Sequence, residues 1–289
     1  MKPAPFSYHL PETVDDLLAL TDEHSESGRI LAGGQSLVPL LNMRRLRVDH
    51  IIDINGLGGL NRVQRQGDTL VIGALVRQGR ALADPVVSSA APLVVEAVGR
   101  VASATVRNRG TLCGSLAFAS PAGQIPAAVL AMGGGVSVRH VSGDRSIDFG
   151  DLFTGPFATA LRPGEVMTEL RLSLWPSHAG YAFVEVGRAR WPVVSAASLV
   201  ELDSNVVSRC AIALAGVADT PVRATTIERA FIGSVPTDEL IAALVRGVTN
   251  DLDVPTNIYG TSTYRSQVAE VLARRSLITA SDRAGRVAQ

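Results

Sequence analysis

The sequence predicts an α+β protein with two N-terminal subdomains and a C-terminal α+β domain, in which an antiparallel sheet is combined with helices. Three observations support this fold class. Residues 13–54 follow the order helix, strand, glycine turn, helix, strand. Residues 68–172 contain several β-rich segments, and after residue 180 strands precede helices. A length of 289 residues is enough for about two domains.

The first subdomain contains a predicted βαβ unit. Thr13 is followed by two aspartates and an apolar stripe, which is typical of a capped helix start. Residues 29–32 and 51–54 have strand composition. Leucines recur at helical spacing from Leu37 onward. In such a unit an anion can lie beside the glycine turn at the start of the second helix.

The second subdomain is predicted to be antiparallel. Its expected strands are residues 69–72, 135–139, 145–149 and 165–172. A helix from Pro121 to about Met132 is expected to interrupt them, with Pro121 at the first helical position and Gly133 just past the end.

A segment with linker composition, residues 175–180, places a domain boundary near residue 177. The strands expected beyond it are residues 181–186, 195–202 and 209–215, and the helices are residues 227–231, 237–248 and 262–276. We expect the tail after Ala280 to be frayed.

Composition excludes several classes of protein. The 27 basic and 27 acidic residues give a net charge of zero, so a nucleic-acid or anionic-membrane partner is not expected. The N-terminus lacks the apolar run of a signal peptide, and no transmembrane segment is evident, which predicts a cytoplasmic protein. Cys113 and Cys210 are the only cysteines, so any iron–sulfur cluster must be held by another chain.

Two glycine-bearing loops carry the strongest functional signal. One is Leu31-Ala-Gly-Gly-Gln-Ser-Leu-Val38 and the other is Arg109-Gly-Thr-Leu-Cys-Gly-Ser-Leu116. Glycine lets backbone N–H groups approach an anion, and Ser36, Thr111 and Ser115 add hydroxyl donors. The pair predicts a split pyrophosphate cradle, although from composition alone ordinary tight turns remain an equal alternative.

Other catalytic signatures are absent. The five histidines lie far apart in the sequence, with no pair at helical spacing beside an acid, which argues against a zinc hydrolase and favours surface or structural histidines. Ser36 is not in a nucleophile elbow, so it is a better donor than nucleophile. No Walker lysine and no G-x-G-x-x-G pattern occurs, which argues against a P-loop hydrolase and an ordinary dinucleotide fold.

The amino-acid sequences of both loops resemble those of the FAD-binding medium subunit of molybdenum hydroxylases. This is the family of carbon monoxide dehydrogenase, xanthine dehydrogenase, and nicotine and quinoline hydroxylases. The resemblance extends over nearly the whole chain. Its main motifs are Pro5-Phe-Ser-Tyr8, Ala32-Gly-Gly-Gln-Ser-Leu37, Val106-Arg-Asn-Arg-Gly-Thr-Leu-Cys-Gly-Ser-Leu-Ala117, Phe153-Thr-Gly155, Ala160-Leu-Arg-Pro-Gly-Glu165, Pro221-Val-Arg-Ala224 and Tyr264-Arg265.

This resemblance implies a two-subdomain FAD-binding fold of the vanillyl-alcohol-oxidase/PCMH type over residues 1–176, with subdomains of about 1–55 and 56–176, and a C-terminal flavoprotein domain over residues 177–289. The chain would carry FAD. A small partner subunit would hold two [2Fe–2S] clusters and a large one the molybdopterin cofactor, in a dimer of heterotrimers. FAD would relay electrons from the clusters to an external acceptor while the large subunit hydroxylates an N-heteroaromatic substrate. No residue of this chain is expected to be catalytic.

The resemblance also assigns cofactor-binding residues. Backbone N–H groups of the first loop would wrap the pyrophosphate, Thr111, Gly114 and Ser115 would close on it, and Leu161 would lie against the isoalloxazine. The first-loop residues are Ala32, Gly33, Gly34, Gln35, Ser36 and Leu37. Gln124 replaces a frequent acid and can hydrogen-bond a ribose hydroxyl. Trp191 either shields the isoalloxazine or is an ordinary interface residue.

One departure from the family pattern makes a structural prediction. The usual second Gly-Gly reads Cys113-Gly114, which requires a negative φ at Cys113. Because Cys113 and Gln124 depart from the pattern, a structural subunit without FAD remains an alternative. A stand-alone flavin oxidoreductase is the other, but no histidine or cysteine is identifiable as its base or covalent flavin tether.

Overall fold

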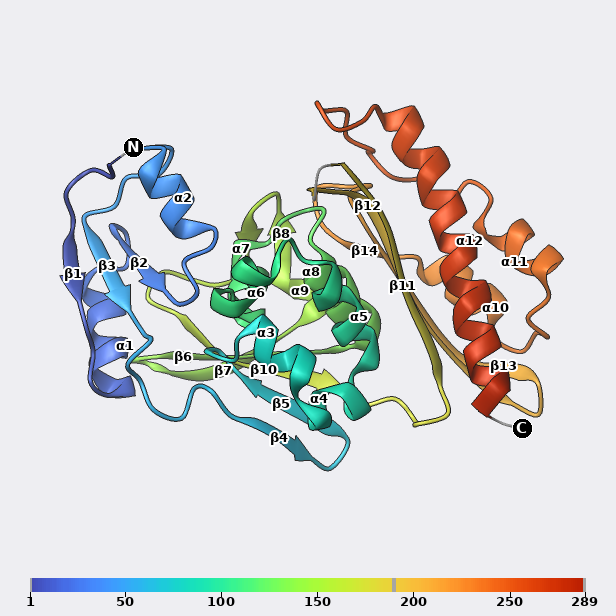
Figure 1. The fold of residues 1–289 in the computed structure, drawn as a ribbon, viewed down its shortest axis with the longest axis horizontal. Coiled ribbons are helices and arrows are strands. Elements are labelled where there is room, and N and C mark those ends of the chain that lie inside the picture. Colours follow the sequence, from blue (N-terminus) through green and yellow to red (C-terminus); the bar gives the residue numbers. More distant parts are fainter. Residues whose placement is uncertain (1, 189–190, 288–289) are drawn as a thin grey trace.

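The structure is a computed structural model that describes residues 2–188 and 191–287. Three units follow one another along the long axis of the molecule (Figure 1). The N-terminal unit lies at one end, a middle unit with its own sheet lies beside it, and a C-terminal unit of long strands and helices lies at the other end.

The N-terminal unit is the predicted βαβ arrangement. Its elements are β1 (Ser7–His9), α1 (Val14–Glu23), β2 (Gly28–Leu31), α2 (Leu37–Asn42) and β3 (His50–Asp53). The three strands form a parallel sheet in the order β1-β3-β2. A capping box begins α1: Thr13 Oγ1 accepts from Asp16 N at 3.1 Å, and Asp16 Oδ2 accepts from Thr13 N at 3.0 Å.

The middle unit is antiparallel, as the sequence predicts. Its elements are β4 (Val63–Gln66), β5 (Thr69–Gly73), α3 (Gln78–Ala83), α4 (Pro85–Ala90), α5 (Pro92–Arg100), α6 (Ala104–Arg109), α7 (Leu112–Phe118), α8 (Gln124–Met132), β6 (Gly134–His140), β7 (Gly143–Asp148), α9 (Phe149–Leu152), β8 (Phe153–Gly155), β9 (Ala158–Thr159) and β10 (Val166–Ser173). The main sheet has the order β4-β5-β10-β6-β7, and β8 pairs with β9.

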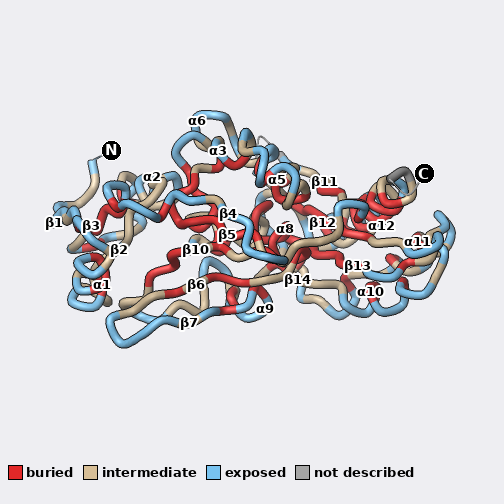
Figure 2. Tube along the Cα trace, turned by 90° about the horizontal axis from the view of Figure 1, so that it is seen from below, coloured by how far each residue is buried: buried red, intermediate tan, exposed pale blue. Residues whose placement is uncertain are grey.

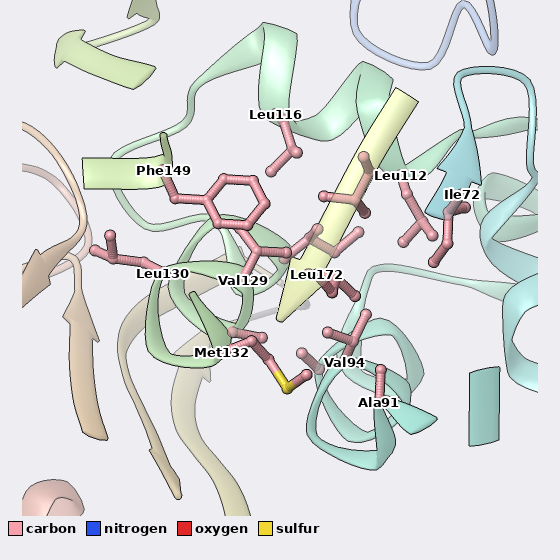
Figure 3. Close-up of a cluster of buried hydrophobic side chains, with 14 of the residues drawn as sticks. Ile72, Ala91, Val94, Leu112, Leu116, Val129, Leu130, Met132, Phe149 and Leu172 are labelled. Carbon is pink, nitrogen blue, oxygen red and sulfur yellow. The ribbon is translucent and has the colours of Figure 1, made fainter. Parts of the chain in front are cut away.

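The core of the middle unit lies between this sheet and its helices. Leu116, Val129 and Phe149 meet there with Leu172 of β10 (Figure 3). Every residue of α8 is buried, since α8 contacts the middle sheet on one side and the C-terminal sheet on the other. A helix that is apolar all round is typical of such a central position.

The helix that contains Met132 begins later than predicted. Pro121 lies in a turn closed by a 2.9 Å bond from Gly123 N to Ser120 O, and Gly123 is the N-cap of α8. The carbonyl of Pro121 accepts instead from Gly216 N at 2.9 Å, which is a contact with the C-terminal unit. This long-range bond, which the local pattern does not reveal, keeps residues 121–123 out of the helix. Gly133 ends the helix with a φ of 82°, as expected.

The C-terminal unit is an antiparallel sheet covered on both faces. Its elements are β11 (Gly180–Arg188), β12 (Trp191–Asp203), β13 (Val206–Ala215), β14 (Val222–Arg223), α10 (Thr225–Phe231), α11 (Asp238–Val245) and α12 (Ser262–Val287). The strand order is β11-β12-β13-β14. Helix α12 packs along β11 and β12, while α5 and α8 contact the sheet from the middle unit. Buried residues therefore run continuously from β10 through α8 into β12 (Figure 2).

The expected fraying after Ala280 is wrong, because α12 continues to Val287. Ala280 and Ala284 are buried against β11, and a Cβ on Gly180 would lie 1.8 Å from the Ala280 carbonyl oxygen. Arg283 Nη1 donates to Glu96 Oε1 at 2.7 Å. The segment after Ala280 is mostly polar, but its small residues lie on one helix face and pack closely on the sheet.

No helix in residues 2–188 and 191–287 is long and apolar enough to cross a membrane.

Candidate functional site

A cavity of about 660 Å³ opens between the N-terminal and middle units. Both glycine loops line it, together with Phe157, Thr159 and residues 161–167, which extend from β9 into the start of β10. Small-molecule sites commonly occupy roughly 300–1,000 Å³, so the cavity has the size of a cofactor site.

The cavity brings together the predicted cofactor-binding residues of three separate segments. Those that line it are Ala32, Gly33, Gly34, Gln35, Ser36, Leu37, Thr111, Gly114, Ser115 and Leu161. Gln124 and Trp191 do not line it. Their assignment to the cofactor stays a prediction, but the convergence of two loops that are eighty residues apart matches the predicted split cradle.

The first loop offers a row of free donors. In the described part of the chain, the backbone N–H groups of residues 33–37 have no hydrogen-bond acceptor. Gly34 has a φ of 71°, a conformation that favours glycine. A Cβ on Gly33 would lie 2.5 Å from Arg109 O and 2.7 Å from Gly110 Cα, so only glycine lets the two loops approach this closely. Ser36 makes no side-chain cap bond to α2, which leaves its hydroxyl available.

The second loop is fixed by its own hydrogen bonds. Thr111 is the N-cap of α7, and its Oγ1 accepts from Gly114 N at 2.9 Å. A Cβ on Gly114 would lie 2.7 Å from that same Oγ1, so glycine is required for the cap. Cys113 lies inside α7 and is not among the residues with positive φ, which confirms the predicted negative φ. Burial raises the pKa of the Cys113 thiol to about 12, so it packs as a small apolar residue.

Gln78 is a cavity residue that the sequence analysis missed. It is 3% exposed and lines the cavity at the start of α3. Its Nε2 donates to Ser115 Oγ at 2.9 Å and to Thr111 O at 3.3 Å. Within the described residues its Oε1 is buried and has no hydrogen-bond donor. A buried amide oxygen without a donor is costly.

A second missed group holds the two glycine loops together. Asn55, just after β3, donates from Nδ2 to Ala32 O at 2.9 Å. Arg77 donates from Nη2 to Asn55 Oδ1, and from Nη1 to Arg109 O at 2.7 Å. Burial lowers the pKa of Arg77, and the nearby charge of Arg109 lowers it further. Neither Asn55 nor Arg77 belongs to a glycine loop, so no loop motif marked them.

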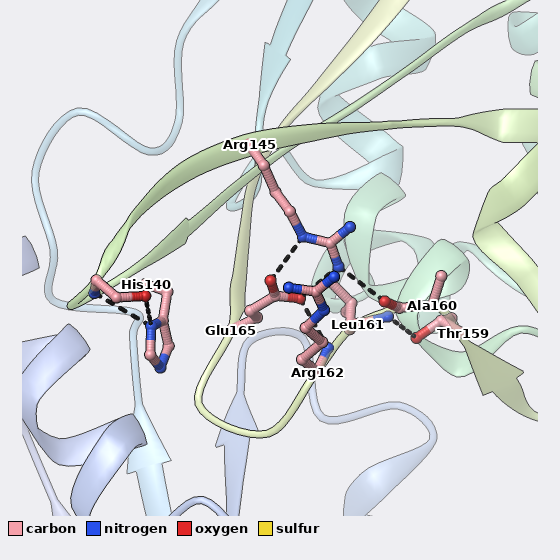
Figure 4. Close-up of polar contacts among 8 residues, drawn as sticks. His140, Arg145, Thr159, Ala160, Leu161, Arg162 and Glu165 are labelled. Atoms are coloured by element: carbon pink, nitrogen blue, oxygen red, sulfur yellow. Dashed lines mark hydrogen bonds and ion pairs between the residues drawn. The ribbon is translucent and has the colours of Figure 1, made fainter.

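The segment that carries Leu161 is anchored by an ion pair (Figure 4). Arg145 of β7 donates from Nε to Glu165 Oε1 at 2.6 Å and from Nη2 to Glu165 Oε2 at 2.7 Å. The same Nη2 donates to Ala160 O at 2.9 Å, and Arg162 N donates to Glu165 Oε2 at 2.7 Å. Mainly through the Arg145 hydrogen bonds, the pKa of Glu165 is held below its usual range. The pair fixes the backbone on both sides of Leu161.

Gln124 lies away from the cavity, at the junction of the middle and C-terminal units. It is buried, and its Nε2 donates weakly to Arg100 O at 3.4 Å. Glu185 lies nearby on β11. Burial raises the pKa of Glu185, while a hydrogen bond from Gln124 and the charge of Arg100 lower it.

Trp191 begins β12, and 62% of it is exposed. Its ring stacks on Tyr259, with centroids 6.3 Å apart. In this structure Trp191 therefore contacts another residue of the C-terminal unit and not the cavity.

Two family models match the chain. Residues 4–175 match the FAD binding domain in molybdopterin dehydrogenase, and residues 181–280 match the CO dehydrogenase flavoprotein C-terminal domain. These matches define the chain as a flavoprotein with the PCMH-type FAD-binding fold and a C-terminal α+β domain. The chain belongs to the FAD-binding medium subunits of molybdenum hydroxylases, and it is an oxidoreductase subunit.

Individual relatives cover nearly the whole chain. The chain is 34% identical to the 6-hydroxypseudooxynicotine dehydrogenase complex subunit alpha of Paenarthrobacter nicotinovorans, over 98% of this chain and 97% of that protein. It is 33% identical to the caffeine dehydrogenase subunit beta of Pseudomonas sp. strain CBB1, with the same coverage. A solved carbon monoxide dehydrogenase from Hydrogenophaga pseudoflava superposes with a TM-score of 0.95 at 30% identity, over 98% of this chain and 99% of that one.

The residues present fit the cofactor that the family implies. FAD requires anion binding along its pyrophosphate, and the cavity offers the free N–H groups of residues 33–37. Gln78, which also lines the cavity, has a buried Oε1 without a donor in the described chain. FAD is therefore the cofactor of this chain, and molybdenum–pyranopterin and iron–sulfur groups belong to partner subunits of the family's complexes.

Proposed function

We propose that this chain is the electron-transfer subunit of a molybdenum hydroxylase complex, and that its FAD relays electrons from [2Fe–2S] clusters of a small subunit to an external acceptor. The observation that carries the proposal is the cavity in which both glycine loops meet, with Gly33 in close contact with Arg109 and Gly110. When bound, FAD supplies a centre that accepts and releases one or two electrons.

The residues of the chain would bind and orient the cofactor. Backbone N–H groups of residues 33–37 would bind the pyrophosphate, with Ser36 and Ser115 adding hydroxyl contacts. Gln78 Oε1 would accept a hydrogen bond from a hydroxyl of the cofactor. Leu161 would exclude water from the flavin end, held there by the Arg145–Glu165 pair.

Our proposal for the complex extends to substrate and assembly. A large subunit would hydroxylate an N-heteroaromatic compound, and two heterotrimers would associate in the cytoplasm. The names of relatives support the substrate class, because caffeine dehydrogenase and a quinoline 2-oxidoreductase are among the matches. We place the domain boundary at residues 176/177, between the two family matches.

The test is to purify the untagged chain, record its visible spectrum, and identify the released cofactor against FAD and FMN standards. We expect one FAD per chain. The co-expressed complex is then mixed with candidate N-heteroaromatics without an acceptor, and bleaching of the flavin absorbance is followed. Bleaching that requires the iron–sulfur subunit supports the relay. Bleaching of the isolated chain by substrate would favour a stand-alone oxidoreductase, and a colourless complex would favour a structural subunit without FAD.

A further inference from the structure

Three histidines converge in the N-terminal unit, although they are far apart in the sequence. His9 ends β1, His24 is the C-cap of α1, and His50 begins β3. His9 Nε2 lies 2.9 Å from His50 Nδ1, and the His24 and His50 rings stack with centroids 3.7 Å apart. One ring nitrogen from each histidine lies within 4.8 Å of the others. The wide spacing of these histidines in the sequence argues against a zinc hydrolase, but the fold brings their side chains together.

The backbone holds this cluster in place. Parallel pairing of β1 with β3 sets Ser7 opposite His50 and brings His9 onto the same sheet. The end of α1 is joined to β2 by a 2.7 Å bond from Gly28 N to His24 O, and a Cβ on Gly28 would lie 2.7 Å from that oxygen. A strand, a helix end and a second strand therefore deliver one histidine each.

The environment of His9 favours its uncharged form. All three histidines are partly buried, and the His24 side chain is 13% exposed. Burial lowers the pKa of His9, and the neighbouring His24 and His50 lower it further. One hydrogen shared by His9 Nε2 and His50 Nδ1 satisfies only that contact. The rings of His24 and His50 stack face to face, so neither ring donates a hydrogen bond to the other. A cation would satisfy all three nitrogens at once.

We propose that His9, His24 and His50 bind one first-row divalent cation, such as Zn²⁺, through one ring nitrogen each. Imidazole is a preferred ligand of Zn²⁺, Cu²⁺ and Ni²⁺ and not of Mg²⁺ or Ca²⁺. Zn–N bonds of about 2.0–2.1 Å at tetrahedral angles hold the ligand nitrogens about 3.3 Å apart. The 2.9 Å contact between His9 Nε2 and His50 Nδ1 must therefore lengthen and lose its hydrogen, the more distant nitrogen must draw closer, and the stacked rings must open. Glu23, whose Oε1 is 3.9 Å from His24 Nε2, can supply the fourth ligand, or water can.

The ion would be structural. It joins the N-terminal strand to the end of α1 and to β3, and His24 also lines the cofactor cavity. Binding to the folded state alone raises the melting temperature. We expect a rise of about 5–10 °C with a hundredfold excess of ion over its Kd.

The experiment uses the full chain with its FAD and without a polyhistidine tag. After EDTA treatment and dialysis, Zn²⁺ is titrated by calorimetry and bound metal is counted by mass spectrometry. Co²⁺ serves as a second probe, since tetrahedral nitrogen ligation gives it a visible absorption band. We expect one ion per chain, bound at micromolar concentration or tighter, and the predicted rise in melting temperature.

Variants decide whether the three histidines are the ligands. His9→Gln and His24→Gln should each weaken Zn²⁺ binding at least about tenfold and remove the Co²⁺ band. The metal-free melting temperature and the FAD content of His9→Gln should stay near wild type, because His9 does not line the cofactor cavity; this separates a lost ligand from misfolding. His178→Gln is the matched control, because His178 lies outside the cluster. Binding of Zn²⁺ only at millimolar concentration, or equal binding by wild type and His24→Gln, would overturn the proposal.

Discussion

Gly33 of the first loop and Arg109 of the second pack so closely that a Cβ on Gly33 would lie 2.5 Å from the Arg109 carbonyl oxygen. The contact joins the N-terminal unit to the middle unit at the wall of the cavity. A side chain at residue 33 would push the loops apart and would move the free N–H groups of residues 33–37 away from the second loop.

The first prediction is that Gly33→Ala weakens FAD binding by about 5- to 150-fold, the range that corresponds to an overpacking cost of about 1–3 kcal/mol. FAD retained after gel filtration, measured as the ratio of flavin to protein absorbance, gives the readout. Gly58→Ala is the control, because nothing lies within 4 Å of a Cβ there. Stoichiometric FAD in Gly33→Ala would show that the cofactor does not need this close approach.

Arg77 supports the cradle without lining it. Its guanidinium contacts Asn55 Oδ1 and Arg109 O, and Asn55 in turn holds Ala32 O. We expect Arg77→Ala to weaken FAD binding about 5- to 10-fold, because a partly exposed charge-assisted hydrogen bond is worth about 1 kcal/mol. Fluorescence titration of the deflavinated chain measures this. Arg80→Ala, in the helix that follows Arg77, should not change affinity, because Arg80 bonds to Asn61 O.

The order of elements and the pattern of glycines allowed much of the fold to be predicted from the sequence. The capping box at Thr13, the βαβ unit and the antiparallel strands are local patterns, and each occurs as expected. The short helices of residues 78–118 were not predicted, since none is longer than nine residues and periodicity needs a longer window. The extension of α12 depends on packing against Gly180, which no local pattern contains.

The sequence predicted the parts of the candidate site in which the backbone requires glycine. Glycines in motifs located both loops, but Gln78, Asn55 and Arg77 act across strand and helix ends far from those motifs. Likewise His9 and His50 come together only through the parallel pairing of β1 and β3. Contacts that form only in the tertiary structure produce no characteristic spacing of residues in the sequence.

Gln78 provides a prediction in which cofactor affinity and stability separate. In Gln78→Leu the Oε1 that has no donor in the described chain disappears, but so do the Nε2 bonds to Ser115 Oγ and Thr111 O. These effects oppose each other, so the unfolding free energy of the FAD-free chain should change by less than about 1 kcal/mol. FAD affinity should fall about tenfold, because a cofactor hydroxyl loses its acceptor. Thermal unfolding with and without FAD checks both effects. Gln66→Leu, an exposed change on β4, is the control. Equal FAD affinity in Gln78→Leu and wild type would contradict the assignment.

The ion pair between Glu165 and Arg145 predicts how the stability of the folded chain changes in acid. Its side chain is 6% exposed and pairs with Arg145, so its pKa in the folded chain lies below the unfolded value of about 4.3. The pair therefore contributes stability above about pH 5, and this contribution is lost as the pH falls through the folded pKa. Because Arg145 is 32% exposed, we expect only about 1–2 kcal/mol at neutral pH.

The corresponding variant is Glu165→Gln, which keeps the shape of the side chain and removes its charge. Its unfolding free energy, measured by urea titration between about pH 7 and pH 3, should be lower than wild type at neutral pH and should approach wild type in acid. FAD should also dissociate faster near neutral pH, since the backbone around Leu161 loses its anchor at Ala160 and Arg162. The half-exposed pair of Glu169 and Arg171 supplies the control, and Glu169→Gln should leave both the pH profile and FAD release close to wild type. Parallel pH profiles for wild type and Glu165→Gln would mean that other carboxylates govern acid sensitivity.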